Sequence, residues 1–188
     1  MSQLQFFTGN TNFWLAAVGW EGKVAFIKQP MFQKNTYTIP IILKKSVHVG
    51  DIYTIDHVDN YAATGGVDNK VCLWNSQSGT VRAIIDLPKE KPNTFISTVR
   101  FVKTSKQTLL FAIQNTGQMH CINPITEMVT ENCLKLQNNA FIDFSNDTEL
   151  LLSVGEQGKG SLIKTTLNDI SPRQSIAKIR RKIGESAH

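Results

Sequence analysis

Short runs of apolar and β-branched residues alternate with turn residues along most of the chain, and this pattern predicts a β protein. The clearest runs are Ala62–Thr64 and Lys70–Trp74. Between them, Asp68-Asn69 suits the positive φ of a hairpin turn. A third run, Ile52–Ile55, precedes the hairpin, and a fourth, Thr80–Ile85, follows it. These residues are therefore expected to form one four-stranded antiparallel sheet.

The same rhythm of strands occurs once before this central unit and twice after it. Ala16–Ile27 mirrors Ala62–Trp74, with Lys23 and Lys70 at an offset of 47 residues. The later units follow at spacings of about 48 and about 42 residues, close to the length of a propeller blade repeat. The other predicted strands are Leu4–Phe7, Ile39–Lys44, Ile96–Val102, Thr108–Ile113, Gln118–Ile122, Met128–Glu131, Ala140–Phe144, Leu150–Val154 and Ser161–Thr165.

Four residues of the central unit can form one hydrogen-bonded chain: His48, Thr64, Asp68 and Trp74. A half-buried indole needs an acceptor for its N–H, and Thr64 can provide it. Such a polar network is stabilising when every member has a partner. The alternative interpretation is a catalytic triad of His48, Asp68 and Thr64, but their spacing favours a structural role.

The positions of these four residues resemble those of the WD-repeat family. The resemblance implies an all-β fold, an incomplete β-propeller of about four antiparallel blades that serves as a rigid platform for binding other proteins. It implies no catalytic activity. Only the central unit carries the full set, because Ile27 and Ile122 stand where Trp74 does and Thr116 replaces Asp68.

A closer resemblance involves three segments, Ala17–Val24, His48–Tyr53 and Ala62–Asp68. Their order is similar to that in the axonemal WD-repeat proteins of motile cilia, in particular those that carry EF-hands elsewhere in the chain. This sequence contains no EF-hand loop and only about half of the blades. The resemblance implies a structural component along microtubules, in the cytoplasm and in the cilium or cytoskeleton. The alternative is a WD-repeat scaffold of an RNA-linked complex, such as one in ribosome biogenesis.

The C-terminal stretch differs from the rest, so we divide the chain into a propeller segment, 1–167, and a basic tail, 168–188. The net charge is +5, and the tail contributes five positive and two negative residues, which is three of those five charges. Ile176, Ile179 and Ile183 recur at helical spacing, which predicts a short basic amphipathic helix. The helix could pack on the propeller rim, bind an acidic partner, or contact a membrane or nucleic acid. Its candidate contact residues are Arg180, Arg181 and Lys182.

No motif for catalysis or cofactor binding is found. The four histidines lack metal-ligand spacing, and Gly155–Ser161 fits no phosphate-loop pattern. The chain has no secretory signal and no apolar run long enough to span a bilayer. Its three cysteines are widely spaced, which favours reduced thiols in an intracellular compartment. We therefore expect no catalytic residue, no cofactor and no metal; nucleic acid and membranes are not the expected partners.

Two expectations concern partners. The segment 28–38 contains Pro30 and is long for a hairpin loop, so it is a candidate contact site. The last predicted sheet has no fourth strand, and exposed edges invite pairing with other chains. We therefore expect the propeller to be completed by a partner or by sequence that is absent here.

Overall fold

The fold is seen in a computed structural model that describes residues 3–8, 12–30, 41–104, 106–138, 141–145, 150–154, 160–164 and 181–185. These residues form sixteen strands and one short 3-10 helix, η1 (Trp20–Gly22). The strands make four separate four-stranded antiparallel sheets. The predicted all-β, propeller-like fold with four blades is thus confirmed.

Each sheet is a meander, in which strands that follow one another in sequence lie side by side. The first sheet contains β1 (Gln3–Thr8), β2 (Asn12–Val18), β3 (Lys23–Pro30) and β4 (Ile41–Ser46). The second contains β5 (Ile52–Val58), β6 (Tyr61–Gly66), β7 (Lys70–Asn75) and β8 (Thr80–Asp86). The third contains β9 (Ile96–Lys103), β10 (Thr108–Gln114), β11 (Gln118–Ile122) and β12 (Val129–Lys135). The fourth contains β13 (Phe141–Ser145), β14 (Leu150–Val154), β15 (Gly160–Lys164) and β16 (Arg181–Glu185).

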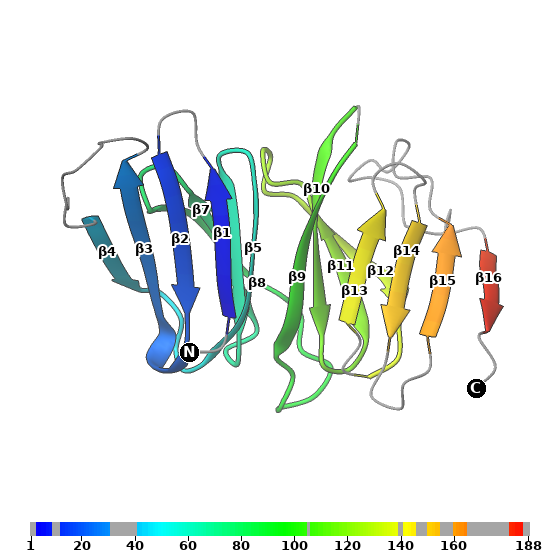
Figure 1. The fold of residues 1–188 in the computed structure, drawn as a ribbon. Helices are drawn as coiled ribbons and strands as arrows, with labels where there is room; N and C mark the ends of the chain where they lie inside the picture. Colours follow the sequence, from blue (N-terminus) through cyan, green and yellow to red (C-terminus); the bar gives the residue numbers. More distant parts are fainter. Residues whose placement is uncertain are drawn as a thin grey trace.

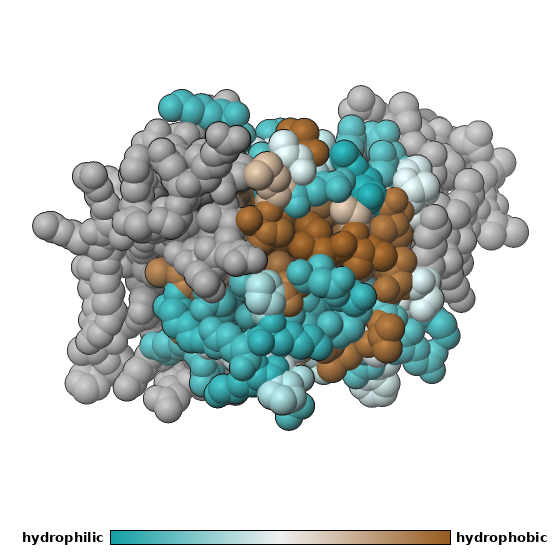
Figure 2. All heavy atoms as spheres, turned by 180° about the vertical axis from the view of Figure 1, so that it is seen from behind, coloured by the Kyte–Doolittle hydropathy of each residue, from teal (hydrophilic) through white to brown (hydrophobic). Residues whose placement is uncertain are grey.

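The four sheets are arranged in chain order, with the first and the fourth at opposite ends (Figure 1). The first strand of each sheet is the inner one: β5 lies against β1 and β9, and β9 lies against β13. Seen from behind, apolar residues form a patch in the middle of the described surface, above a hydrophilic border (Figure 2). The described sheets therefore form an open propeller arc with an inner and an outer side.

The hydrophobic core lies between neighbouring sheets. Alternate residues of each middle strand point to opposite faces, so one strand contributes to two layers of core. In β7, Trp74 packs toward the first sheet and Leu73 toward the third. In β10, Leu110 packs toward the second sheet, and Phe111 lies in a cluster with Ile142 of the fourth. In each of these layers, apolar side chains from two neighbouring sheets are buried against one another.

The predicted C-terminal helix is wrong for residues 181–185, which form strand β16 and pair with β15. Residues 165–180, which hold the rest of the predicted helix, lie outside the described residues. The fourth sheet therefore has the fourth strand that the sequence pattern did not reveal. The physical reason is that β15 has an edge of backbone N–H and C=O groups to pair, and this pairing outweighs a helical spacing of isoleucines.

Two other segments differ from the prediction. Strand β3 continues to Pro30, so the first residues of the predicted insertion belong to the sheet, and 31–40 lie outside the described residues. The predicted weak strand Met128–Glu131 is the longer β12, Val129–Lys135. The glycine-rich turn at 155–159 also lies outside the described residues.

Candidate functional site

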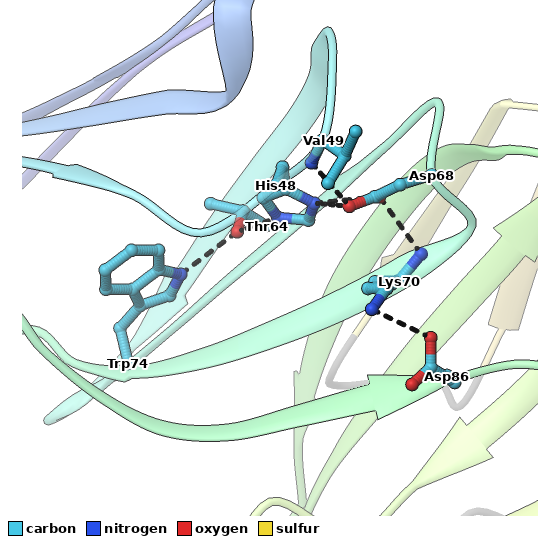
Figure 3. Close-up of polar contacts among 7 residues, drawn as sticks. All are labelled: His48, Val49, Thr64, Asp68, Lys70, Trp74 and Asp86. Atoms are coloured by element: carbon cyan, nitrogen blue, oxygen red, sulfur yellow. Dashed lines mark hydrogen bonds and ion pairs between the residues drawn. The ribbon is translucent and has the colours of Figure 1, made fainter.

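The four residues of the predicted hydrogen-bonded chain come from four different parts of the second blade (Figure 3). His48 lies in the loop that leads from β4 to β5, and Thr64 lies in β6. Asp68 is in the turn after β6, and Trp74 is in β7. At the same turn, Asn69 has a φ of 63°, the positive value that the Asp68-Asn69 pair predicts. The hairpin thus brings together residues that are up to 26 positions apart in the chain.

The hydroxyl of Thr64 is the centre of the network. The indole N–H of Trp74 donates to Thr64 Oγ1 at 3.0 Å, and His48 Nε2 lies 2.8 Å from the same oxygen. On the other side of the ring, His48 Nδ1 lies 2.9 Å from Asp68 Oδ1. Because a carboxylate only accepts hydrogen bonds, Nδ1 carries a hydrogen and donates a hydrogen bond to Asp68. In the neutral ring, Nε2 then accepts the Thr64 hydroxyl proton, so each donor has an acceptor.

Asp68 also anchors the backbone around it. Its carboxylate accepts the N–H of Val49 at 3.0 Å and the N–H of Lys70 at 3.2 Å. Burial by itself would raise the pKa of Asp68 above its ordinary 3.8. The hydrogen bond from His48 and the two backbone N–H groups outweigh burial, and the pKa is lowered. The ionised form of Asp68 is therefore the one that joins the β4–β5 loop to the β6–β7 turn.

The same three groups are ordered like an acid–base–nucleophile triad, with Asp68, His48 and Thr64 in sequence. Their surroundings do not suit that chemistry. The side chain of His48 is 0% exposed and Thr64 is 0% exposed, so no substrate carbonyl can approach Oγ1 without opening the blade. Thr64 also accepts from Trp74, which fixes the orientation of its hydroxyl. In this conformation the arrangement holds strands and turns together.

The network also connects the first and second blades. The ring of Trp74 lies 5.4 Å from that of Phe26 in β3, at an interplanar angle of 59°. This tilted geometry is one that aromatic pairs prefer. The indole N–H of Trp74 is therefore hydrogen-bonded within the second blade. The ring itself packs against Phe26 of the first blade.

Above the network, three loops meet at one edge of the first two blades. The N–H of Ile52 donates to the carbonyl of Gly19 at 3.0 Å, and the N–H of Val67 to that of Asp51 at 2.9 Å. Gly22 has a φ of +69°, and a Cβ there would lie 2.0 Å from the carbonyl oxygen of His48. Only glycine therefore lets the β2–β3 turn lie so close to the β4–β5 loop.

These loops expose three apolar side chains that we call the apolar rim: Trp20 (71% exposed), Val49 (79%) and Val67 (41%). Val67 and the β4–β5 loop are in close contact, since a Cβ on Gly50 would lie 2.6 Å from Val67 Cγ1. Val49 is fixed by its own N–H, which donates to Asp68. The rim therefore consists of exposed apolar groups on backbone that the buried network holds in place.

The other predicted contact residues are Arg180, Arg181 and Lys182. Arg180 lies outside the described residues, and Arg181 and Lys182 are in β16, paired with Lys164 and Ile163 of β15. The apolar rim is not apparent from the sequence, because a single exposed Trp or Val has no distinguishing pattern along the chain. Asp56 of β5, which accepts the N–H of Phe101 in the third blade at 2.7 Å, is not apparent from the sequence either.

Two further observations concern site chemistry. Within the part of the chain that the structure describes, no three His, Cys, Asp or Glu side chains come together to hold a metal ion. Among the same residues, no helix is long and apolar enough to cross a membrane.

No family model matches the chain, and no curated protein matches it.

Proposed function

We propose that the chain is a non-catalytic WD-repeat scaffold that binds another protein through the apolar rim. The observation that carries the proposal is the position of Trp20, Val49 and Val67 on loops tied together by backbone hydrogen bonds. Exposed apolar groups on a rigid surface bind with a small loss of conformational entropy. An aromatic anchor such as Trp20 is typical of residues that dominate binding energy.

The buried network supports the scaffold proposal rather than an enzyme. His48, Thr64 and Asp68 are the groups in this site that could perform acid–base chemistry, and each already has a partner within the blade. Their effect is to fix the β4–β5 loop relative to the β6–β7 turn. Under the proposal, the network acts on binding indirectly, by holding Val49 and Val67 in position.

The partner that we propose is a protein of the ciliary axoneme or another microtubule-associated protein. This rests on the resemblance of Ala17–Val24, His48–Tyr53 and Ala62–Asp68 to axonemal WD-repeat proteins. Each of the three segments contains one residue of the apolar rim: Trp20, Val49 and Val67, in that order. In that setting the chain is a cytoplasmic structural component of the cilium or cytoskeleton.

The test is affinity capture of the tagged chain from ciliated cells, with Trp20→Ser and Val49→Ser compared against Ile84→Ser. Ile84 is also an exposed apolar residue, at 47%, but it lies on β8. The expected result is that tubulin or axonemal proteins are captured by the unmodified chain and by Ile84→Ser, and are lost from the two rim variants. Equal capture by all four proteins would contradict the proposed rim.

The same experiment separates the scaffold from the RNA-linked alternative. Binding through phosphate contacts weakens steeply as salt concentration rises, whereas binding through apolar side chains does not. Retention of the partner in high salt is therefore expected. Recovery of RNA that is lost as salt rises would favour the alternative.

A further inference from the structure

The outer edge of the second blade is formed by β8, which is the last strand in the order β5-β6-β7-β8. One side of β8 pairs with β7. On its other side, no strand of the described chain is paired with it. The backbone N–H and C=O groups on that side can therefore pair with a strand from another molecule. Each of the four sheets ends in such an outer strand, so the side chains of β8 must indicate what would bind there.

Two side chains of β8, Ile84 and Arg82, point to opposite faces of the blade. Ile84 pairs with Cys72, which is buried in the core layer toward the first blade. Arg82 lies over the ring of Tyr61, with Cζ 4.8 Å from the ring centroid. Tyr61 packs against the core layer toward the third blade. The edge therefore offers an apolar group on one face and a positive charge on the other.

A β-bulge at Arg82 produces this arrangement. Trp74 pairs with Val81, and Leu73 pairs with Ala83, so Arg82 is an extra residue without a partner in β7. The bulge lets Arg82 and Ala83 lie on the same side, since Ala83 also packs toward the third blade. After Ala83 the register is continuous to the end of β8. That part of the strand is regular and can pair along its free side.

Both side chains are accessible, and the guanidinium of Arg82 has no counter-charge. Ile84 is 47% exposed, and Arg82 is exposed as well. No carboxylate among the described residues pairs with Arg82, whereas Asp86 at the end of the strand lies 3.3 Å from Lys70 Nζ. Stacking on Tyr61 holds the guanidinium in place. Because a guanidinium binds a carboxylate through paired hydrogen bonds, this edge favours an acidic partner.

An extended segment is the kind of chain that reaches both faces of this edge. Successive side chains of a strand point to opposite faces, so two residues an odd number of positions apart reach Ile84 and Arg82. We propose that β8 binds an extended, acidic segment of a partner protein as a fifth strand of the second blade. An apolar residue of the segment packs on Ile84, and a carboxylate binds Arg82. Main-chain hydrogen bonds supply affinity, and these two side chains supply specificity.

The first test uses a short synthetic peptide of alternating valine and threonine in which one threonine is replaced by glutamate. As a strand, it places its valines on one face and the glutamate on the other. Fluorescence anisotropy measures its binding to the full chain. In an isomer, the glutamate exchanges places with a neighbouring valine and so lies on the face of the other valines. This isomer should bind about fivefold more weakly, and a version N-methylated at every amide should not bind.

The second test changes the edge itself, with Ile84→Lys and Ile125→Lys as a matched pair. Ile125 is 63% exposed and lies in the turn between β11 and β12. Ile84→Lys removes the apolar contact and should weaken binding of the peptide about tenfold, whereas Ile125→Lys should leave it unchanged. Arg82→Glu should bind the original peptide weakly and prefer a peptide with lysine in place of the glutamate. The circular dichroism spectrum should be the same for all three variants.

Four outcomes overturn the proposal: no binding of the peptide, equal binding of either control peptide, equal effects of Ile84→Lys and Ile125→Lys, or no reversal of charge preference in Arg82→Glu. Pairing of β8 with a second copy of the chain also overturns it, and sedimentation would then show a dimer that Ile84→Lys dissociates. These readouts are independent of the apolar rim, because Trp20→Ser and Val49→Ser should bind the peptide as the unmodified chain does. Failure at β8 therefore does not count against the rim, and failure of the rim does not count against β8.

Discussion

Thr64 and Trp74 are ten residues apart on adjacent strands, and a hydrogen bond of 3.0 Å joins the indole N–H to the hydroxyl. Both residues are fully buried. The same hydroxyl also faces His48 at 2.8 Å. One buried oxygen thus connects two strands of the second blade to the loop that enters it, which makes the network sensitive to any change at either end.

Replacement of Trp74 by Ala should reduce the free energy of unfolding by about 3–5 kcal/mol, as is typical for a large core aromatic. The variant removes the contact with Phe26 and leaves a cavity between the first two blades. Trp20→Ala is the matched control, because it is the same substitution at a side chain that is 71% exposed. Urea denaturation of both variants checks the prediction, and a loss below about 1 kcal/mol for Trp74→Ala would contradict it.

Replacement of Thr64 by Val keeps the shape of the side chain and removes its hydroxyl. The indole N–H of Trp74 and Nε2 of His48 then lose their partner in a buried site, which should cost about 1–3 kcal/mol. Thr80→Val, at an exposed position of β8, should change stability by less than about 0.5 kcal/mol. If denaturation gives the two variants equal stabilities, the hydroxyl is not the centre of a cooperative network.

The central hairpin was predictable from the sequence because its information is local. Alternating residues define the strands, Asp68-Asn69 defines the turn, and the spacing of His48, Thr64 and Trp74 defines the network. The strand at 181–185 was not predictable in this way. Its local spacing of isoleucines fits a helix, and its conformation depends on pairing with β15, a contact across an intervening segment.

The contacts between inner strands were also missed, for a different physical reason. Thr54 and Asp56 each accept an N–H from a residue 45 positions later in the chain. Whether such a bond forms depends on how two sheets are placed, which strand periodicity does not determine. The signal available in the sequence was the pair Thr54 and Asp56, two polar residues spaced two positions apart in strand β5.

Cys72 should be unreactive in the folded chain. Burial is the main cause that raises its pKa to about 12, and the nearby carboxylate of Asp68 adds to the shift. At pH 8 about one molecule in ten thousand then carries the reactive thiolate. Maleimide labelling followed by peptide mass spectrometry should find Cys72 unlabelled in the native chain and labelled in urea. Rapid native labelling of Cys72 would show that the second blade opens readily.

Asp68 should stabilise the fold in a pH-dependent way. Its pKa is lowered in the folded state, so its contribution is fully present above the ordinary value of about 3.8 and is lost as pH falls through the folded pKa. The free energy of unfolding of the unmodified chain should therefore approach that of Asp68→Asn below pH 4. Chemical denaturation of both proteins across this range measures the difference. A difference that stays constant with pH would mean that the carboxylate is not held in its ionised form.

Asp56 should show the opposite pH dependence. Burial is the main cause that raises its pKa above the ordinary 3.8, and the N–H of Phe101 and the charge of Arg100 only partly oppose this. For a carboxyl with a raised folded pKa, the stabilising contribution is present below about 3.8 and is lost as pH rises through the folded value. Asp56→Asn keeps an oxygen that can accept the N–H of Phe101 and does not ionise. Relative to this variant, the unmodified chain should therefore lose stability as pH rises from about 4 through the folded pKa of Asp56. Relative to Asp68→Asn it should instead gain stability as pH rises toward about 4, where the contribution of Asp68 becomes complete. The same sign for both variants in one denaturation series would contradict this account of the inner strand.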